Sequence, residues 1–181
     1  SASGLTAFDA DTGVSIWDLG LSCGTVSSPL VVNSALYVTS GGITKLGLDT
    51  PSGKPEVIWA VNQLNSNGAS PLVLDGNFYT LSGAIAKGAN SNTGEILWQL
   101  RLKGRFWATP ILANRHLYFI NQDGLVQIVE VEGVGDSQTP TIVSVIDMGE
   151  SILGTPAAAG NALFIRSDKH LWKVTSTTKV K

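Results

Sequence analysis

Short runs of apolar and β-branched residues alternate with polar turns along the whole chain. Runs such as Leu36–Val38 and Leu117–Phe119 are preceded by the two-residue pairs Asn33-Ser34 and Asn114-Arg115. Such pairs supply the positive φ angles that tight hairpins need. No stretch keeps the 3.6-residue period of an amphipathic helix. The pattern therefore predicts an all-β protein made of short antiparallel strands.

The same arrangement of residues repeats four times. In each copy a small residue, Ser or Thr, and then Pro precede an apolar run, and the successive prolines are 42, 39 and 46 residues apart. Four short strands fit into each interval, which is typical of a β-propeller blade. The proline suits the start of the innermost strand, whose free edge needs no ladder donor. The four prolines are Pro29, Pro71, Pro110 and Pro156.

Tryptophans follow the same period and mark the fourth strand of each blade. Trp17, Trp59 and Trp98 are 42 and 39 residues apart, in phase with the prolines. In the next copy we assign the tryptophan position to Ile146. Two residue types that share one period indicate a true repeat, and rings of packed blades bury such aromatic side chains between neighbours.

The repeat sets the expected domain organisation. We expect one β-propeller segment over 1–181 with about four blades of four antiparallel strands, corresponding to about half of an eight-bladed ring. Because exposed blade edges favour pairing, we also expect a homodimer or pairing with the missing half of the ring. The expected units are an incomplete blade at 1–20, blades at 27–61, 69–100 and 108–148, and a second incomplete blade at 154–175.

Composition narrows the classes of function. The 181 residues include 43% hydrophobic and 14% charged residues with a net charge of −2, which excludes intrinsic disorder. Twelve Lys and Arg spread along the chain disfavour nucleic-acid binding. No apolar run reaches the ~18 residues of a membrane span, so we expect no membrane insertion by this segment. The single cysteine, Cys23, excludes an internal disulfide and any multi-cysteine metal site.

Residues 7–17 carry the sharpest motif, A-F-D-A-D-T-G-V-S-I-W. Asp9 is expected to accept hydrogen bonds from turn amides, Gly13 to take a positive φ, and Trp17 to pack between blades. The motif resembles the tryptophan-docking motif of the PQQ-like (pyrroloquinoline-quinone repeat) β-propeller family. We assign the structural docking positions in three copies to Ala7, Asp9, Thr12, Gly13 and Trp17, to Asp49, Gly53 and Trp59, and to Thr93, Gly94 and Trp98.

The two later copies depart from the motif. Residues 49–59 keep Asp49, Gly53 and Trp59 but have a turn two residues longer, and residues 88–98 replace the aspartate with Asn90. The stretch 130–146 has lost the tryptophan. On the same reasoning we expect Asp11 and Asp49 to act as turn acceptors like Asp9.

The resemblance implies two kinds of function. Quinoprotein alcohol and sugar dehydrogenases of this family bind PQQ with Ca²⁺, and the alcohol dehydrogenases place a disulfide between adjacent cysteines against the cofactor. The BamB-type branch has no cofactor and provides protein-binding scaffolds in the bacterial periplasm. Since this chain has no cysteine pair, we favour a non-enzymatic scaffold or ligand-sensing domain, without cofactor, with a protein partner and an extracytoplasmic location. The alternative is a fragment of a PQQ- and Ca²⁺-dependent dehydrogenase.

One stretch is a candidate surface for a partner or ligand. Arg105, Phe106 and Trp107 come just before an innermost strand, which places them near the mouth of a propeller channel. Arginine and aromatic residues are common anchors of interfaces. Two alternative interpretations stay open. In the first, Phe106 and Trp107 are packing residues that fill the gap between neighbouring blades. In the second, they form a stacking platform for sugars in a carbohydrate-binding propeller. Neither His116 nor His170 has an acidic neighbour that would suggest a catalytic pair.

Overall fold

Every regular element in the described portion of the chain is a β-strand. The computed structural model describes residues 4–24, 26–131 and 140–175. The strands are β1 (Leu5–Phe8), β2 (Ser15–Leu19), β3 (Leu30–Val32), β4 (Ala35–Thr39), β5 (Ile43–Gly47), β6 (Glu56–Val61), β7 (Leu72–Leu74), β8 (Asn77–Ser82), β9 (Ile85–Asn90), β10 (Ile96–Arg101), β11 (Ile111–Ala113), β12 (His116–Ile120), β13 (Leu125–Glu130), β14 (Thr141–Asp147), β15 (Ala157–Ala159), β16 (Ala162–Arg166) and β17 (Leu171–Thr175).

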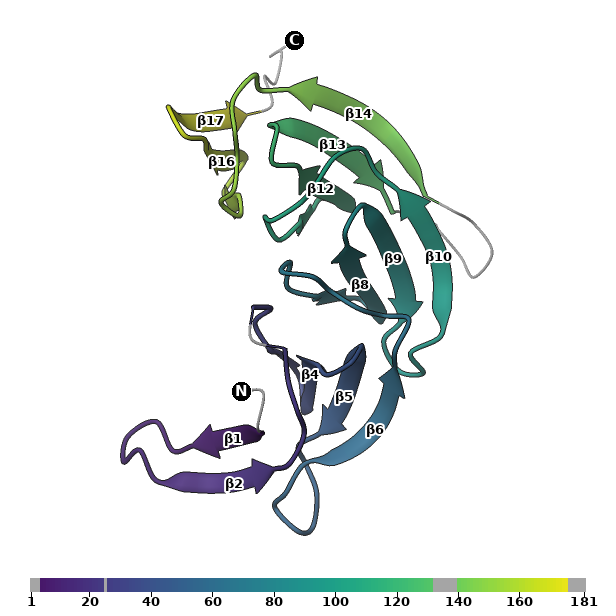
Figure 1. Ribbon diagram of the computed structural model, residues 1–181, viewed down its shortest axis with the longest axis vertical. Helices are drawn as coiled ribbons and strands as arrows, with labels where there is room; N and C mark the ends of the chain where they lie inside the picture. The colour runs from purple at the N-terminus through teal and green to yellow at the C-terminus, as the bar shows by residue number, and fades with distance from the viewer. Residues whose placement is uncertain (1–3, 25, 132–139, 176–181) are drawn as a thin grey trace.

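These strands form five antiparallel sheets arranged as an open arc (Figure 1). We call β1–β2 the N-terminal sheet, β3–β6 the first blade, β7–β10 the second, β11–β14 the third, and β15–β17 the C-terminal sheet. The three blades each have four strands in chain order, whereas the N-terminal sheet has two and the C-terminal sheet three. Strands β2, β6, β10 and β14 lie on the outer rim of the arc. The expected all-β propeller architecture is confirmed.

The hairpins between the first two strands of each blade use the predicted turn chemistry. Asn33, Asp75 and Asn114 have φ angles of 52°, 49° and 48°, and Arg115 has 60°. Asparagine and aspartate tolerate this left-handed region better than other residues with a side chain. The tight turns bring β3 onto β4 with Leu30 opposite Tyr37, and β7 onto β8 with Leu72 opposite Tyr79.

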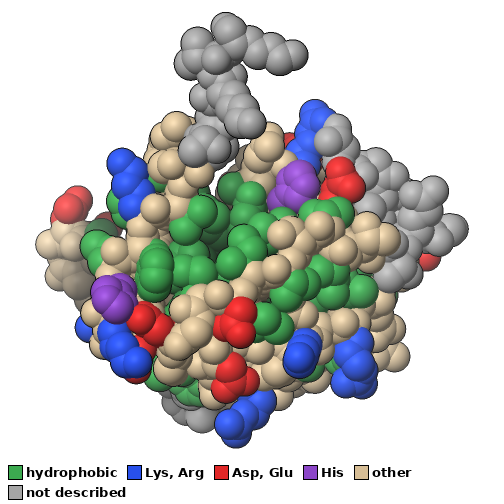
Figure 2. Space-filling view, turned by 90° about the horizontal axis from the view of Figure 1, so that it is seen from above, with side chains coloured by type: hydrophobic (Ala, Val, Ile, Leu, Met, Phe, Trp, Pro, Cys, Tyr) green, Lys and Arg blue, Asp and Glu red, His purple; other side chains and the backbone are tan. Residues whose placement is uncertain are grey.

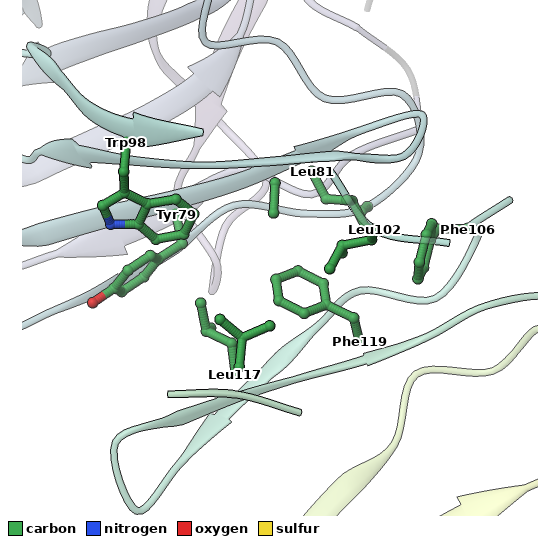
Figure 3. Packing of buried hydrophobic residues seen from close by; sticks show 10 residues of the cluster. Tyr79, Leu81, Trp98, Leu102, Phe106, Leu117 and Phe119 are labelled. Atoms are coloured by element: carbon green, nitrogen blue, oxygen red, sulfur yellow. The ribbon is translucent and has the colours of Figure 1, made fainter. Parts of the chain in front are cut away.

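The hydrophobic core lies between consecutive sheets. Between the second and third blades, Leu102 and Trp98 pack with Leu117, Phe119 and other buried side chains (Figure 3). Separate clusters fill the spaces between the other neighbouring sheets. Because each of the three blades buries one face against the sheet before it and the other against the sheet after it, the fold is a chain of nearest-neighbour contacts.

Some of the expected organisation lies outside the described residues. The incomplete blade predicted at the N-terminus includes residues 1–3, and the predicted blade 108–148 includes residues 132–139, and both of these stretches lie outside the described ranges. The same holds for residue 25 and for the polar tail at 176–181. In the described ranges, no helix has the length and apolar character needed to cross a membrane.

Candidate functional site

The complete docking motif forms a closed polar turn after β1. Asp9 Oδ1 accepts hydrogen bonds from the Thr12 hydroxyl at 2.7 Å, the Thr12 amide at 2.8 Å and the Asp11 amide at 3.2 Å. The Gly13 amide donates to the Asp9 carbonyl at 2.9 Å, and Gly13 has a φ of 70°. The Thr12 hydroxyl and amide hold the pKa of Asp9 below its usual range by stabilising the carboxylate. Asp11 contributes its backbone amide to this turn, whereas its carboxylate accepts no hydrogen bond within the described residues, contrary to its predicted role as a second acceptor.

A degenerate copy of the motif makes the same turn in the second blade. Asn90 Oδ1 accepts from the Asn92 amide at 2.8 Å and the Thr93 amide at 3.2 Å. The Gly94 amide donates to the Asn90 carbonyl at 2.8 Å, and Gly94 has a φ of 75°. The asparagine amide oxygen therefore replaces the aspartate carboxylate as the acceptor, which explains how the turn persists without the acid.

This second turn receives the tryptophan of the preceding blade. Trp59 is 9% exposed, and its Nε1 donates to the Ser91 carbonyl at 3.2 Å. A Cβ on Gly94 would stand 3.0 Å from the Trp59 ring, so only glycine leaves room for the indole. The Ser91 carbonyl also accepts from Lys45 Nζ at 2.9 Å and from the Tyr37 hydroxyl at 3.3 Å. This one carbonyl thus accepts hydrogen bonds from three side chains of the first blade.

The copy at residues 49–59 is built differently. Within the described ranges Asp49 accepts no hydrogen bond, so its predicted role as a turn acceptor is wrong. The Gly53 amide donates instead to the Thr50 carbonyl at 3.1 Å, because the two extra residues move the turn away from Asp49. Gly53 has nothing within 4 Å of an added Cβ. Trp17, which is half-buried, packs on Leu36 and its neighbours and does not cover Gly53.

The tryptophan position of the third blade belongs to Ser144, so our assignment to Ile146 is wrong. In β10 and β6 the tryptophan lies beside a register shift, opposite Gly88 and Lys45. At the matching shift in the third blade, Ser144 lies opposite Ile128. Spacing in the sequence agrees, because Ser144 precedes Pro156 by 12 residues, as each tryptophan precedes the next repeat proline.

Serine and threonine hydroxyls before the repeat prolines link neighbouring sheets. The Ser28 amide donates to Ser70 Oγ at 2.9 Å, and the Ser70 amide donates to Thr109 Oγ1 at 2.9 Å. The Thr109 amide donates to Thr155 Oγ1 at 3.1 Å. We call this series the hydroxyl ladder. It explains why a hydroxyl residue precedes each proline, a role that the sequence pattern alone does not reveal.

The structure separates the three residues of the candidate partner surface. Phe106 is 8% exposed and packs edge-to-face on Phe119, with ring centroids 6.5 Å apart and planes at 81° (Figure 3). Phe106 therefore fills the space between the second and third blades, and the two-ring stacking platform considered for carbohydrate binding does not form. Arg105 is exposed, and its carbonyl accepts from the Gln122 amide at 2.8 Å. Trp107 is 54% exposed.

Trp107 borders a cavity of about 330 Å³ between loops of neighbouring sheets. The Trp107 ring lies over Gly68, where an added Cβ would be 3.9 Å from it. Ser27, Ser66 and Asn67 contribute hydroxyl and amide groups, and none of the described residues around the cavity is charged. An exposed indole beside neutral hydrogen-bonding groups can bind an apolar or amphipathic group of a ligand.

A histidine–carboxylate pair joins the third blade to the C-terminal sheet, contrary to the expectation that His170 has no acidic neighbour. His170 Nδ1 lies 2.6 Å from Glu150 Oε1, and the other oxygen of Glu150 accepts from the Ser167 hydroxyl. The Ser167 hydroxyl and then His170 lower the pKa of Glu150. The partners are 20 residues apart, so only the packing of the two sheets brings them together. Ser167 Oγ accepts from the His170 amide at 2.8 Å and donates to the His170 carbonyl at 3.1 Å, so within the described residues it is bonded to the backbone of His170 and not to the imidazole that a general base would use.

Two features would support the cofactor chemistry of a quinoprotein, a metal-binding cluster and a pair of adjacent cysteines. No cluster of three or more His, Cys, Asp or Glu side chains that could hold a metal ion occurs in them. Cys23 is the single cysteine of the sequence, so no disulfide of adjacent cysteines can form against a quinone.

Comparison with solved structures identifies the architecture. The structure of BamB from Moraxella catarrhalis matches with a TM-score of 0.66 at 21% identity, over 99% of this chain and 53% of that one. The chain has the fold of the PQQ-like repeat propellers. The computationally designed Ika8 protein matches this propeller segment with a TM-score of 0.69 at 12% identity, over 96% of this chain and 52% of that one.

A third neighbour is an enzyme, a europium-containing methanol dehydrogenase. It matches with a TM-score of 0.52 at 15% identity, over 68% of this chain and 24% of that one. The propeller segment therefore spans about half the length of the BamB and Ika8 chains and a quarter of the dehydrogenase. No family model and no curated protein matches its sequence.

Proposed function

We propose that this chain is a non-enzymatic, extracytoplasmic propeller segment that binds a protein partner at the cavity beside Trp107. The exposed indole carries the proposal, because a tryptophan with more than half of its surface in water contributes little to its own fold and is a frequent anchor of interfaces. The neutral groups around the cavity suit an apolar side chain of a partner flanked by its peptide bonds.

The BamB likeness supports the class of function. BamB is a protein-interacting component of the outer membrane assembly complex and a periplasmic lipoprotein. A shared fold at 21% identity does not transfer a specific partner, since one fold hosts many functions. The proposal therefore rests on the cavity for the site and on BamB for the kind of partner and the location.

Site-specific photo-crosslinking tests the proposal. A photoreactive phenylalanine analogue replaces Trp107 in one variant and Val145, an exposed residue of the outer strand β14, in a matched control. We expect a discrete protein adduct from envelope extracts at position 107 and none at 145. The captured protein, once purified, should bind the unlabelled chain about tenfold more tightly than the Trp107→Ala variant. Equal binding by both forms would contradict the site.

The dehydrogenase alternative has its own test. The methanol dehydrogenase neighbour supports it, whereas the lack of a fitting cofactor set among the described residues opposes it. Titration with PQQ and Ca²⁺ is followed through the fluorescence of the five tryptophans. We expect no saturable quenching. Quenching that saturates at about micromolar cofactor would favour the dehydrogenase and make oxidation of alcohols or sugars the next assay.

A further inference from the structure

The position three residues before each repeat proline carries an exposed apolar side chain in three of the four copies. Val26, Trp107 and Leu153 are 58%, 54% and 56% exposed, and Gly68 has the same position in the remaining copy. None of the three side chains belongs to a core cluster of the described residues. Packing within the fold therefore does not explain them. We call these four residues the apolar row.

The first three members of the apolar row meet at the cavity beside Trp107. A Cβ added to Gly68 would lie 3.8 Å from Val26 Cγ1 and 3.9 Å from Trp107 Cε3, so both side chains border the space over the glycine. All three residues line the cavity, whereas Leu153 does not. The apolar row therefore continues past the cavity by one repeat.

The hydroxyl ladder sets the spacing of the apolar row. Its bonds join the amide of one segment to the hydroxyl of the next at 2.9, 2.9 and 3.1 Å. With standard covalent geometry, successive Cα atoms of the ladder are at most about 7 Å apart. The row lies two residues earlier in the same segments, and Ser27 Oγ donates to the Ala69 carbonyl at 3.1 Å at the position between. Members of the row therefore repeat at about the spacing of the ladder.

An extended peptide has a repeat of similar length. Every second side chain of a β-strand points to the same face, and such side chains are about 6.7 Å apart along the strand. A strand that lies across the hydroxyl ladder therefore brings one side chain to each member of the apolar row. Gly68 leaves the cavity of about 330 Å³ open to one of these side chains, and the other members offer apolar contacts.

The charge beside the row indicates an acidic residue in such a peptide. The ten residues before the proline carry no charge in the first two copies and two acidic residues in the fourth, whereas residues 100–109 carry three basic residues and no acidic one. Among these, Arg105 is exposed two residues before Trp107, and its guanidinium makes no ion pair within the described residues. Opposite charges steer and orient a partner on such a surface.

Exposure alone does not distinguish the apolar row from the rest of the surface. Hydrophobic side chains also gather in the middle of the end of the molecule that Figure 2 shows, and the outer strands β6 and β14 expose valine and isoleucine. The row differs in three respects: it recurs with the repeat, it borders the cavity, and the hydroxyl ladder holds its members at a fixed spacing.

We propose that the protein partner binds through an extended segment that lies across the hydroxyl ladder, with alternate apolar side chains on the apolar row and an acidic residue beside Arg105. The inference rests on the proposed function and names the form in which the partner binds. Apolar side chains of the segment pack on Val26, Trp107 and Leu153, and the side chain that faces Gly68 enters the cavity. The intervening side chains point away from the row, because they belong to the other face of the strand.

Fluorescence anisotropy with labelled synthetic peptides tests the form of the partner. The probe T-L-D-L-T-L-T-G has leucines at alternate positions and one aspartate, and the control T-T-D-L-L-L-T-G has the same composition with consecutive leucines. We expect the alternating peptide to bind about tenfold more tightly. Lysine in place of the aspartate should weaken binding to the wild-type chain, and Arg105→Glu should restore it. Equal binding of the two leucine arrangements, or binding of neither, would overturn the proposal.

Leu153 separates this inference from the proposed function, because it belongs to the row but not to the cavity. Leu153→Ala should weaken binding of the alternating peptide about fivefold. Leu74→Ala makes the same change at a residue that is 46% exposed at the far end of the innermost strand β7, and it should have no effect. Circular dichroism of each variant shows that the fold is retained.

The partner captured by crosslinking then distinguishes the two ways of failing. If Trp107→Ala weakens its binding and Leu153→Ala does not, the cavity binds a single side chain, so the extended segment is wrong and the proposed function stands. If neither substitution weakens its binding, the proposed site is wrong as well. Loss of affinity in both variants, with Leu74→Ala unchanged, is the result that we expect.

Discussion

Two turns with the same hydrogen-bond pattern differ in whether a tryptophan of the neighbouring sheet packs on them. The turn at Asp9–Gly13 has every residue of the docking motif, yet an added Cβ on Gly13 would meet nothing. The turn at Asn90–Gly94 has lost the aspartate, yet it carries the Trp59 indole and three hydrogen bonds on the Ser91 carbonyl. The motif therefore specifies the shape of a turn, and the neighbouring sheet decides whether that shape stabilises the fold.

Removing a repeat tryptophan should give the largest difference in stability between Trp59, which packs on the turn of the next blade, and Trp17, which does not. Trp59→Ala should lower the free energy of unfolding by about 3–5 kcal/mol, because it leaves a large cavity and the Ser91 carbonyl loses a donor. Trp17→Ala should cost about 2 kcal/mol, since Trp17 is half-buried and does not cover the turn that follows it. Urea unfolding of both variants measures the difference, and equal losses would contradict it.

Replacing the turn glycine with alanine should give an intermediate difference in the free energy of unfolding between the two turns. Gly94→Ala should cost about 2–3 kcal/mol, because its Cβ would press on the Trp59 ring and its φ is 75°. Gly13→Ala has the same backbone strain at φ 70° and open space, so about 1 kcal/mol is expected. Thermal unfolding at low protein concentration compares the two. A larger loss at Gly13 would mean that its turn is covered.

Lowering the pH should give the smallest difference between the two turns, because only the turn at Asp9 contains a titrating side chain. The folded pKa of Asp9 lies below its unfolded value, so its contribution to stability is present above the ordinary aspartate pKa and is lost as the pH falls through the folded pKa. Asn90 does not titrate. Between about pH 6 and about pH 3, the Thr12 amide should lose protection relative to the Thr93 amide. Comparable loss at both amides in NMR exchange experiments would show that the carboxylate is not responsible.

The repeat made the fold predictable, and the same repeat contained information that we misread. Proline and tryptophan spacing gave the blades, because both residues occupy fixed places in a periodic structure. Ser144 was missed because a small polar residue has no signature of its own, although its 12-residue distance to Pro156 matches the other copies. Asp49 was misassigned because the two inserted residues move the turn, so that the Gly53 amide donates to the Thr50 carbonyl. The residue types at these positions do not indicate this shift.

The site was less predictable than the fold. Phe106 and Trp107 are adjacent and both aromatic, yet alternation along the chain sends one ring into the core and the other to the surface. The sequence could place the pair near the channel but could not say which ring is exposed. The contact of Glu150 with His170 depends on how two consecutive sheets pack, so no local pattern indicates it.

The hydroxyl ladder bears on how such a protein grows. Each residue within the series supplies a backbone donor to the sheet after it and a hydroxyl acceptor to the sheet before it. A duplicated repeat inserted anywhere in the series would meet a hydroxyl acceptor in the sheet after it and a backbone amide donor in the sheet before it. Duplication of a whole repeat can therefore lengthen the array, and deletion of one can shorten it, without a compensating mutation at the junction.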